Sequence, residues 1–292
     1  MSEPFQLLNQ PSLHQPVLLI SLDGWIDAGS AAAQAMAAFV EELNATPIIR
    51  FDADAFIDYR ARRPTMQLRD GVMANLAWPS IELQAGRDMN GNDVLLLTGS
   101  EPDSQWLRFV DLVDEFAKGF GVRMAIGLGA YPFGAPHTRP SLIAGSASTP
   151  ELADSAGLVR STVDAPAGIA AALEHRLAQH NVPTVGLWVQ VPHYASAMAY
   201  PGAAVSLVDT IHQLSGVTVE AQSLRDAAVA HRARLDELVS QSAEHLGMVH
   251  QLEEAFDAML RSSDSIVRPG ESLPSGDELA AELERFLRDQ GR

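Results

Sequence analysis

Short apolar runs alternate with amphipathic stretches along the first three quarters of the chain. The runs are six to eight residues long and carry few polar positions, which is typical of strands buried on both faces of a sheet. The predicted buried strands are 16–22, 46–51, 93–99, 122–129 and 184–191. Apolar residues at helical spacing predict helices between them, at 30–44, 103–121, 166–181 and 201–216. This alternation predicts an α/β fold.

Turn and cap signals give these elements their expected limits. Ser30 and Asp103 stand where N-caps of two helices are expected, and Asn90-Gly91 is a strong turn signal before the strand at 93–99. The segments 71–78 and 80–86 are predicted to be antiparallel strands, after a polar stretch at 58–66. Two more short strands are predicted at 141–148 and 157–163.

From about residue 220 the pattern becomes helical alone. Two charged, amphipathic segments at 220–242 and 245–263 precede a breaker-rich link at 265–276 and a last predicted helix at 277–290. We therefore predict two parts, an α/β domain over 1–219 and an all-helical C-terminal region over 220–292.

Charge and composition exclude several classes of function. The net charge is −17 and Lys118 is the only lysine, so no basic surface is expected for nucleic acid or for anionic lipid. The absence of cysteine excludes disulfides and thiol chemistry. The first residues lack the pattern of a signal peptide, and the apolar runs are too short to span a membrane. A cytoplasmic protein is expected.

Polar and aromatic side chains follow four of the predicted buried strands. The carboxyl ends of parallel strands meet at one edge of a sheet, so these residues are expected to share a rim where α/β proteins bind ligands. The side chains predicted to face this rim are Asp23, Trp25, Asp27, Glu101, Tyr131, His137, Arg139, His193 and Tyr194.

The first of these loops, Asp23–Gly29, has two interpretations. Asp23 and Asp27 are either a general acid/base pair or caps of the next helix, and capping is favoured. Gly24 and Gly29 serve positive φ angles or close backbone approach. The loop has neither the Gly-Lys-Ser/Thr of a P-loop nor the Gly-x-Gly-x-x-Gly of dinucleotide-binding proteins.

The other rim residues also have two interpretations each. His137 and His193 are acid/base groups or metal ligands, or they brace their loops by hydrogen bonding. Trp25 and Tyr131 stack on a ligand or cover the sheet edge. Arg139 holds an anion or pairs with a carboxylate of the rim. The carboxylates considered for that pairing are Asp23, Asp27 and Glu101.

Classical catalytic signatures are missing. The sequence contains no Gly-x-Ser-x-Gly elbow, no His-Glu-x-x-His and no cysteine nucleophile. A metal site would need at least three converging ligands, and the spacing of the candidates does not establish one. Those candidates are Asp23, Glu101, His137 and His193. We predict no catalytic residue, cofactor or metal.

Five segments taken in order resemble the PAC2 family, named for proteasome assembly chaperone 2, and its actinobacterial branch in particular. They are LLISLDGWIDAGSAA, DYRARRP, LLLTGSEPDSQW, GLGAYPFGAPHTRP and VPHYASAMAYPGAAVSLVDTI. The resemblance covers about residues 16–216, and the helical tail also resembles that branch. It implies a three-layer α/β sandwich similar to the phosphorylase or hydrolase-like fold, together with self-association or partner binding and no established chemistry.

Two hypotheses of function follow. The first is a non-enzymatic protein-binding or assembly-chaperone-like protein. The second is a hydrolase or phosphorylase-like enzyme, or a binder of a small anionic or nucleoside-like ligand, acting at the loops after the parallel strands with Arg139 on the anion.

A homo-oligomer is expected, with a trimer as the first choice, and another protein is a further possible partner. Because like-charged subunits repel, their contact must be apolar or paired through arginines. Arg60, Arg62 and Arg63 form the most basic stretch and are predicted to lie near a subunit boundary or the rim.

Overall fold

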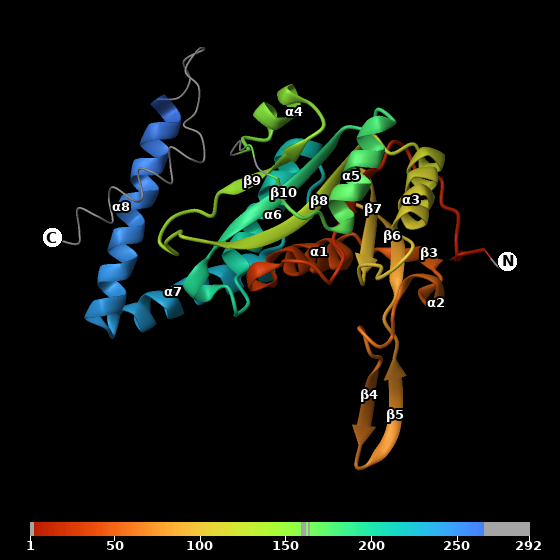
Figure 1. Cartoon of the computed structure of the whole chain (residues 1–292), viewed down its shortest axis with the longest axis horizontal. Helices are drawn as coiled ribbons and strands as arrows, with labels where there is room; N and C mark the ends of the chain where they lie inside the picture. Colours follow the sequence, from red (N-terminus) through yellow and green to blue (C-terminus); the bar gives the residue numbers. More distant parts are fainter. Residues whose placement is uncertain (1–2, 159–161, 163, 266–292) are drawn as a thin grey trace.

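A central sheet runs through the protein, whose computed structural model describes residues 3–158, 162 and 164–265. Within these residues eight strands form this sheet (Figure 1). In spatial order they are β1 (Phe5–Leu7), β3 (Thr46–Phe51), β6 (Ile81–Arg87), β7 (Asp93–Gly99), β2 (Val17–Ile20), β8 (Met124–Phe133), β10 (Thr184–Pro192) and β9 (Ile143–Ala147). The neighbours β7, β2, β8 and β10 pair in parallel, and the strands outside them pair antiparallel.

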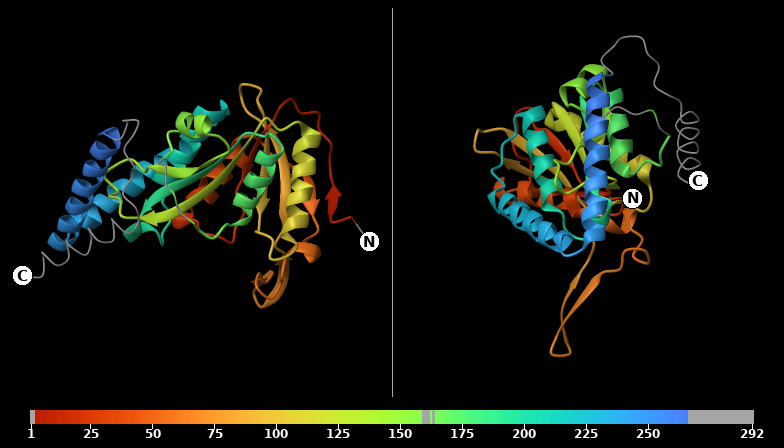
Figure 2. Two further views of the ribbon diagram at one scale, coloured as in Figure 1. Left: turned by 45° about the horizontal axis from the view of Figure 1, so that its top comes forward. Right: turned by 90° about the vertical axis from the view of Figure 1, so that its left-hand side faces the viewer.

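Helices cover both faces of this sheet, and two further helices extend beyond its edge (Figures 1 and 2). In chain order, the helices are α1 (Ala31–Glu42), α2 (Ala53–Phe56), α3 (Trp106–Phe120), α4 (Pro150–Ser155), α5 (Ile169–Gln179), α6 (Pro201–Ser215), α7 (Gln222–Ser240) and α8 (Ala243–Ser265). Two short 3-10 turns are η1 (Ala28–Ser30) and η2 (His193–Ala195). The predicted three-layer α/β fold with C-terminal helices is confirmed.

The central strands are buried on both faces, as their apolar runs predict. Val17 and Leu19 of β2 pack with α1 and α6, whereas Leu18 and Ile20 pack with α3 and α5. Successive side chains of a strand point to opposite faces, so one short apolar run contributes to two separate cores.

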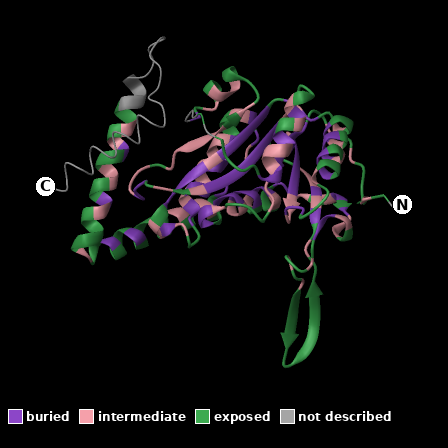
Figure 3. Cartoon of the chain, viewed as in Figure 1, coloured by how far each residue is buried: buried purple, intermediate pink, exposed green. Residues whose placement is uncertain are grey.

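The strand pairing predicted for 71–78 with 80–86 is wrong. Instead β5 (Val72–Ala77) pairs with β4 (Thr65–Arg69), and β6 joins the main sheet between β3 and β7. The cause is Asp70-Gly71, because both residues have positive φ and form a two-residue hairpin turn between Arg69 and Val72. The hairpin β4–β5 projects away from the body, and all residues of its two strands are exposed (Figure 3).

Three other expectations need comment. A helix, α4, precedes the segment predicted as a strand at 157–163, and Gly157 ends it with a positive φ; residues 159–161 and 163 lie outside the described residues. The helix predicted at 277–290 also lies outside them. Helix α3 begins at Trp106, so Asp103 does not cap it.

None of the helices in the described part of the chain is long and apolar enough to cross a membrane.

The two C-terminal helices pack one after the other along the chain, first on the α/β domain and then on each other. Helix α7 contacts α6, and α8 contacts α7. Leu235 and Val239 of α7, with Val249 and Phe256 of α8, are buried. These residues recur at helical spacing, which explains the amphipathic pattern of the tail.

Candidate functional site

A cavity of about 200 Å³ lies at the carboxyl ends of the central strands. Strands β2 and β8 are neighbours. The chain leaves β2 through α1 on one face, whereas the connection from β8, after passing through β9 and α4, returns to the sheet through α5 on the other face. The connections also run in opposite directions along the sheet, toward β3 and toward β10. This is the topological switch point at which open α/β sheets bind ligands.

The loop after β2 forms one wall of this cavity. The main-chain N–H of Asp23 donates to Gly99 at 2.8 Å, and the carbonyl of Asp23 accepts from Glu101 N–H at 2.7 Å. Gly29 has φ +62°, and any Cβ there would collide with Tyr200. The loop is therefore pinned along the strand ends, and its last glycine is required by close packing.

Asp27 caps α1, which is the interpretation that the sequence favoured. Its carboxylate accepts hydrogen bonds from Ala32 N–H at 2.9 Å and from Ala33 N–H at 3.0 Å. Ser30, the expected cap, has a left-handed backbone and makes no side-chain cap bond. Burial raises the pKa of Asp27, the two hydrogen bonds oppose this, and the neighbouring carboxylate of Asp23 raises it further.

Glu101 caps the helix on the other face of the sheet. It is buried, and one carboxylate oxygen accepts from Ile169 N–H at the start of α5 at 2.7 Å. Two helix N-termini thus flank the cavity, and each is met by a carboxylate of the chain.

Two tryptophans complete the walls. Trp25 lies against Gly168, and the ring of Trp188 covers Gly129, so that a side chain on either glycine would crowd an indole. Trp188 was not among the predicted residues. It lies in the middle of β10, inside a run with the pattern of an ordinary buried strand, so no local signal identified it.

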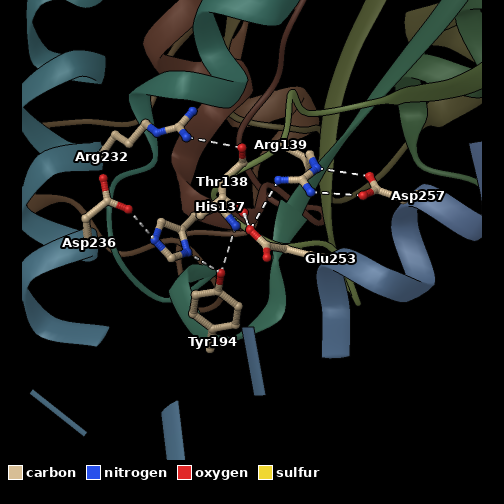
Figure 4. A network of polar contacts seen from close by, with 8 residues as sticks. All are labelled: His137, Thr138, Arg139, Tyr194, Arg232, Asp236, Glu253 and Asp257. Carbon is tan, nitrogen blue, oxygen red and sulfur yellow. Dashed lines mark hydrogen bonds and ion pairs between the residues drawn. The ribbon is translucent and has the colours of Figure 1, made fainter. Parts of the chain in front are cut away.

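The second group of predicted rim residues lies against the C-terminal helices (Figure 4). His137 is buried, its Nδ1 lies 2.6 Å from the hydroxyl of Tyr194, and its Nε2 lies 3.1 Å from a carboxylate oxygen of Asp236 on α7. The hydroxyl of Tyr194 also accepts from His137 N–H at 2.8 Å. The histidine braces its loop.

Arg139 pairs with α8 and not with the carboxylates that the sequence suggested. Its Nε and Nη2 donate to the two oxygens of Asp257 at 3.0 and 2.9 Å, and its Nη1 donates to Glu253 at 3.2 Å. Thr138 donates to the same oxygen of Glu253, and Arg232 donates to Thr138 O. We call this set, with His137, Tyr194 and Asp236, the clasp.

The sequence favoured Asp27 as a helix cap in the loop Asp23–Gly29, but it did not predict the ion pairs of the clasp. Glu253 and Asp257 are four residues apart and therefore share a face of α8. This spacing indicates that one basic side chain can bind both carboxylates. The sequence around them does not identify Arg139 as that side chain.

The remaining predicted residues have simpler surroundings. Tyr131 accepts a hydrogen bond from Gln190 at 2.9 Å, and exposed His193 contacts the ring of Tyr194. Arg62 pairs with Asp103 and donates to Asp23 O, whereas Arg60 and Arg63 are exposed at the base of the hairpin. The described ranges contain no group of three histidine or carboxylate side chains placed to hold a metal ion.

Sequence reasoning also missed Glu174, a buried carboxyl on α5. Any Cβ at Gly127 or Gly186 would collide with it, so two glycines of the sheet make room for its head group. The hydroxyl of Ser146 donates a hydrogen bond to a carboxylate oxygen of Glu174 at 3.2 Å. Burial raises the pKa of Glu174 to about 7.

Solved structures similar to this chain include proteins from Mycobacterium, Corynebacterium and Streptomyces. A Mycobacterium tuberculosis protein of unknown function is 34% identical with a TM-score of 0.84, covering 91% of this chain and 93% of its own. A M. tuberculosis proteasome-assembly chaperone homologue is 31% identical with a TM-score of 0.74, covering 80% of this chain and 99% of its own.

A more distant neighbour shares the fold alone. It is an archaeal proteasome activator from Pyrococcus furiosus, 14% identical with a TM-score of 0.63, covering 80% of this chain and 97% of its own. A search of the curated proteins finds no match. The family model that matches residues 21–239 is that of the PAC2 family, and the chain belongs to this family.

Proposed function

We propose that the chain is a non-enzymatic assembly protein that binds proteins, beginning with copies of itself, in a chaperone-like role. The relative described as a proteasome-assembly chaperone homologue supports this role. The observation that carries the proposal is the projecting hairpin. The enzymatic alternative is not taken further, because the arginine expected to hold an anion is engaged by Glu253 and Asp257.

The hairpin exposes apolar side chains far from the body. Met73 is 71% exposed and Val72 is 67% exposed, and Met66, Leu68 and Leu76 are exposed beside them. A two-stranded hairpin is only marginally stable alone in water. Exposed apolar side chains grouped on such an arm are typical of a surface that another protein covers.

The charge of the arm favours a second copy of this chain as its partner. Residues 60–78 contain four arginines and one aspartate, in a chain of net charge −17. A positive arm is attracted to the acidic body of a neighbouring subunit, whereas two bodies repel each other. A ring of three subunits remains our first expectation, with Arg60 and Arg63 at the boundary.

Light scattering at micromolar concentration tests self-association. The native chain should give a multiple of 31.4 kDa. Replacing Val72, Met73 and Leu76 by Ser should weaken association about a hundredfold or more, since each buried apolar side chain contributes about 1.5–3 kcal/mol. A monomeric mass for the native chain would exclude the proposal.

Two matched variants sharpen the result. Leu107→Ser with Val229→Ser removes exposed apolar side chains from the body and should leave the mass unchanged. Arg60→Glu with Arg63→Glu should weaken association, and Arg108→Glu with Arg234→Glu, exposed elsewhere, should not. If both arginine pairs behave alike, net charge and not the arm governs association.

A further inference from the structure

The cavity at the switch point is not suited to bind phosphate, although helix N-termini often do so. Helix N-termini bind phosphate through free N–H groups. Here Asp27 occupies the N–H groups of Ala32 and Ala33, and Glu101 occupies that of Ile169. A phosphate would have to displace two carboxylates of the chain and would be repelled by them.

The rest of the wall is aromatic and apolar. Trp25 and Trp188 face the cavity together with Leu128 and small residues from α1 and α5. None of the described residues that line it is a lysine, an arginine or a histidine. Aromatic faces attract organic cations, and the attraction grows when the cation leaves water.

One carboxylate remains to meet a charged ligand. Asp23 is exposed and is one of the residues that line the cavity, and within the described part of the chain its carboxylate enters no hydrogen bond or ion pair. Arg62 approaches the same loop from outside the cavity, where it binds the main-chain oxygen of Asp23 and pairs with Asp103. Arg62 therefore does not pair with the carboxylate of Asp23.

We propose that this cavity binds a small organic cation, a primary or quaternary alkylammonium, between Trp25 and Trp188 with its charge toward Asp23. The volume of about 200 Å³ equals about seven water molecules, which limits the ligand to a similar number of heavy atoms. The proposal goes beyond the assembly role, and it holds whether or not the chain self-associates.

Choline and its neutral isostere 3,3-dimethylbutan-1-ol provide the direct test on the full chain. Choline chloride should quench tryptophan fluorescence and raise the melting temperature, relative to sodium chloride of equal ionic strength. The isostere should bind at least about tenfold more weakly, since it lacks the charge. Phosphate and AMP should produce neither signal, because a carboxylate of the chain stands at each helix N-terminus and repels an anion.

Three variants assign the signal to this cavity. Asp23→Asn should weaken choline binding about fivefold, and Asp70→Asn on the hairpin should not change it. Trp25→Leu should weaken binding about tenfold, and Trp78→Leu, an exposed tryptophan outside the cavity, should not. Trp25 is 44% exposed, so its replacement leaves the core intact, and circular dichroism confirms folding of each variant.

Three results would overturn the proposal. One is equal binding of choline and the neutral isostere, which indicates an apolar cavity without cation selectivity. Another is binding of phosphate or AMP that choline competes away. The last is the absence of any choline signal at 10 mM, about the weakest affinity that stabilises a fold measurably.

Discussion

The two groups of polar residues at the carboxyl edge of the sheet handle charge in opposite ways. In the cavity, carboxylates meet main-chain N–H groups at the starts of α1 and α5. In the clasp, carboxylates of α7 and α8 meet His137 and Arg139. Among the described residues, the cavity is lined by carboxylates and by no lysine, arginine or histidine, whereas the clasp joins the tail to the core.

In the cavity, the partners are near in sequence at α1 but not at α5, where Glu101 and its N–H donor are 68 residues apart. Asp27 and Ala32 are five residues apart, whereas His137 and Asp236 are 99 apart. Helix N–H groups are present wherever a helix begins, so a carboxylate next to one is satisfied locally. A side-chain ion pair needs both elements to be docked first.

The largest expected effect comes from Glu174, a buried carboxyl that contrasts with the capping carboxylates of the cavity. Glu174 lies on the helix that Glu101 caps, but within the described ranges its one donor is the hydroxyl of Ser146. Its pKa rises from 4.5 to about 7 on folding, so the folded state holds a proton that the unfolded chain has lost. Stability should fall by about 3 kcal/mol as pH rises from 4.5 through 7.

Glu174→Gln should remove this loss. Urea unfolding at several pH values gives the free energy of unfolding of both proteins. The contributions of the other titrating groups cancel in the difference between the two free energies. Glu115→Gln, exposed on α3, is the matched control and should keep the native pH dependence. A parallel pH dependence of the native protein and Glu174→Gln would show that folding leaves the pKa of Glu174 unchanged.

A smaller effect is expected when the cavity loses one of its carboxylates. Glu101→Ala leaves Ile169 N–H buried without its acceptor and should cost about 2 kcal/mol of unfolding free energy. Glu101→Gln keeps an acceptor and should cost less than half as much. Equal stability of the alanine variant and the native protein would mean that water replaces the carboxylate there.

The smallest global effect is expected in the clasp. The side chain of Arg139 is one-third exposed, so Arg139→Ala should cost about 1 kcal/mol or less. Its local effect should be larger, with faster limited proteolysis within α8 and no change in choline binding. Arg108→Ala, exposed on α3, is the control. Unchanged cleavage of α8 would show that the apolar contacts of the tail suffice to hold it.

Particular elements show where sequence reasoning succeeded. The run at 93–99 became β7, and the apolar face of 103–121 became the packing face of α3, with Phe109, Val110 and Val113 buried. The hairpin β4–β5 was missed although Asp70-Gly71 marked it, because the longer apolar runs on either side of Trp78 took precedence. Trp188 and Glu174 were missed because both sit inside segments that have the pattern of ordinary core.

The sequence by itself determined the buried parallel strands, the amphipathic helices around them and the cap made by Asp27, because each depends on spacing within one or two elements. The tertiary structure alone decided that Arg139 meets Asp257, 118 residues away, and that Glu101 reaches the start of α5. Periodicity specifies which face of an element is buried. The partner of a charged side chain depends on how the elements dock, and no local pattern records that docking.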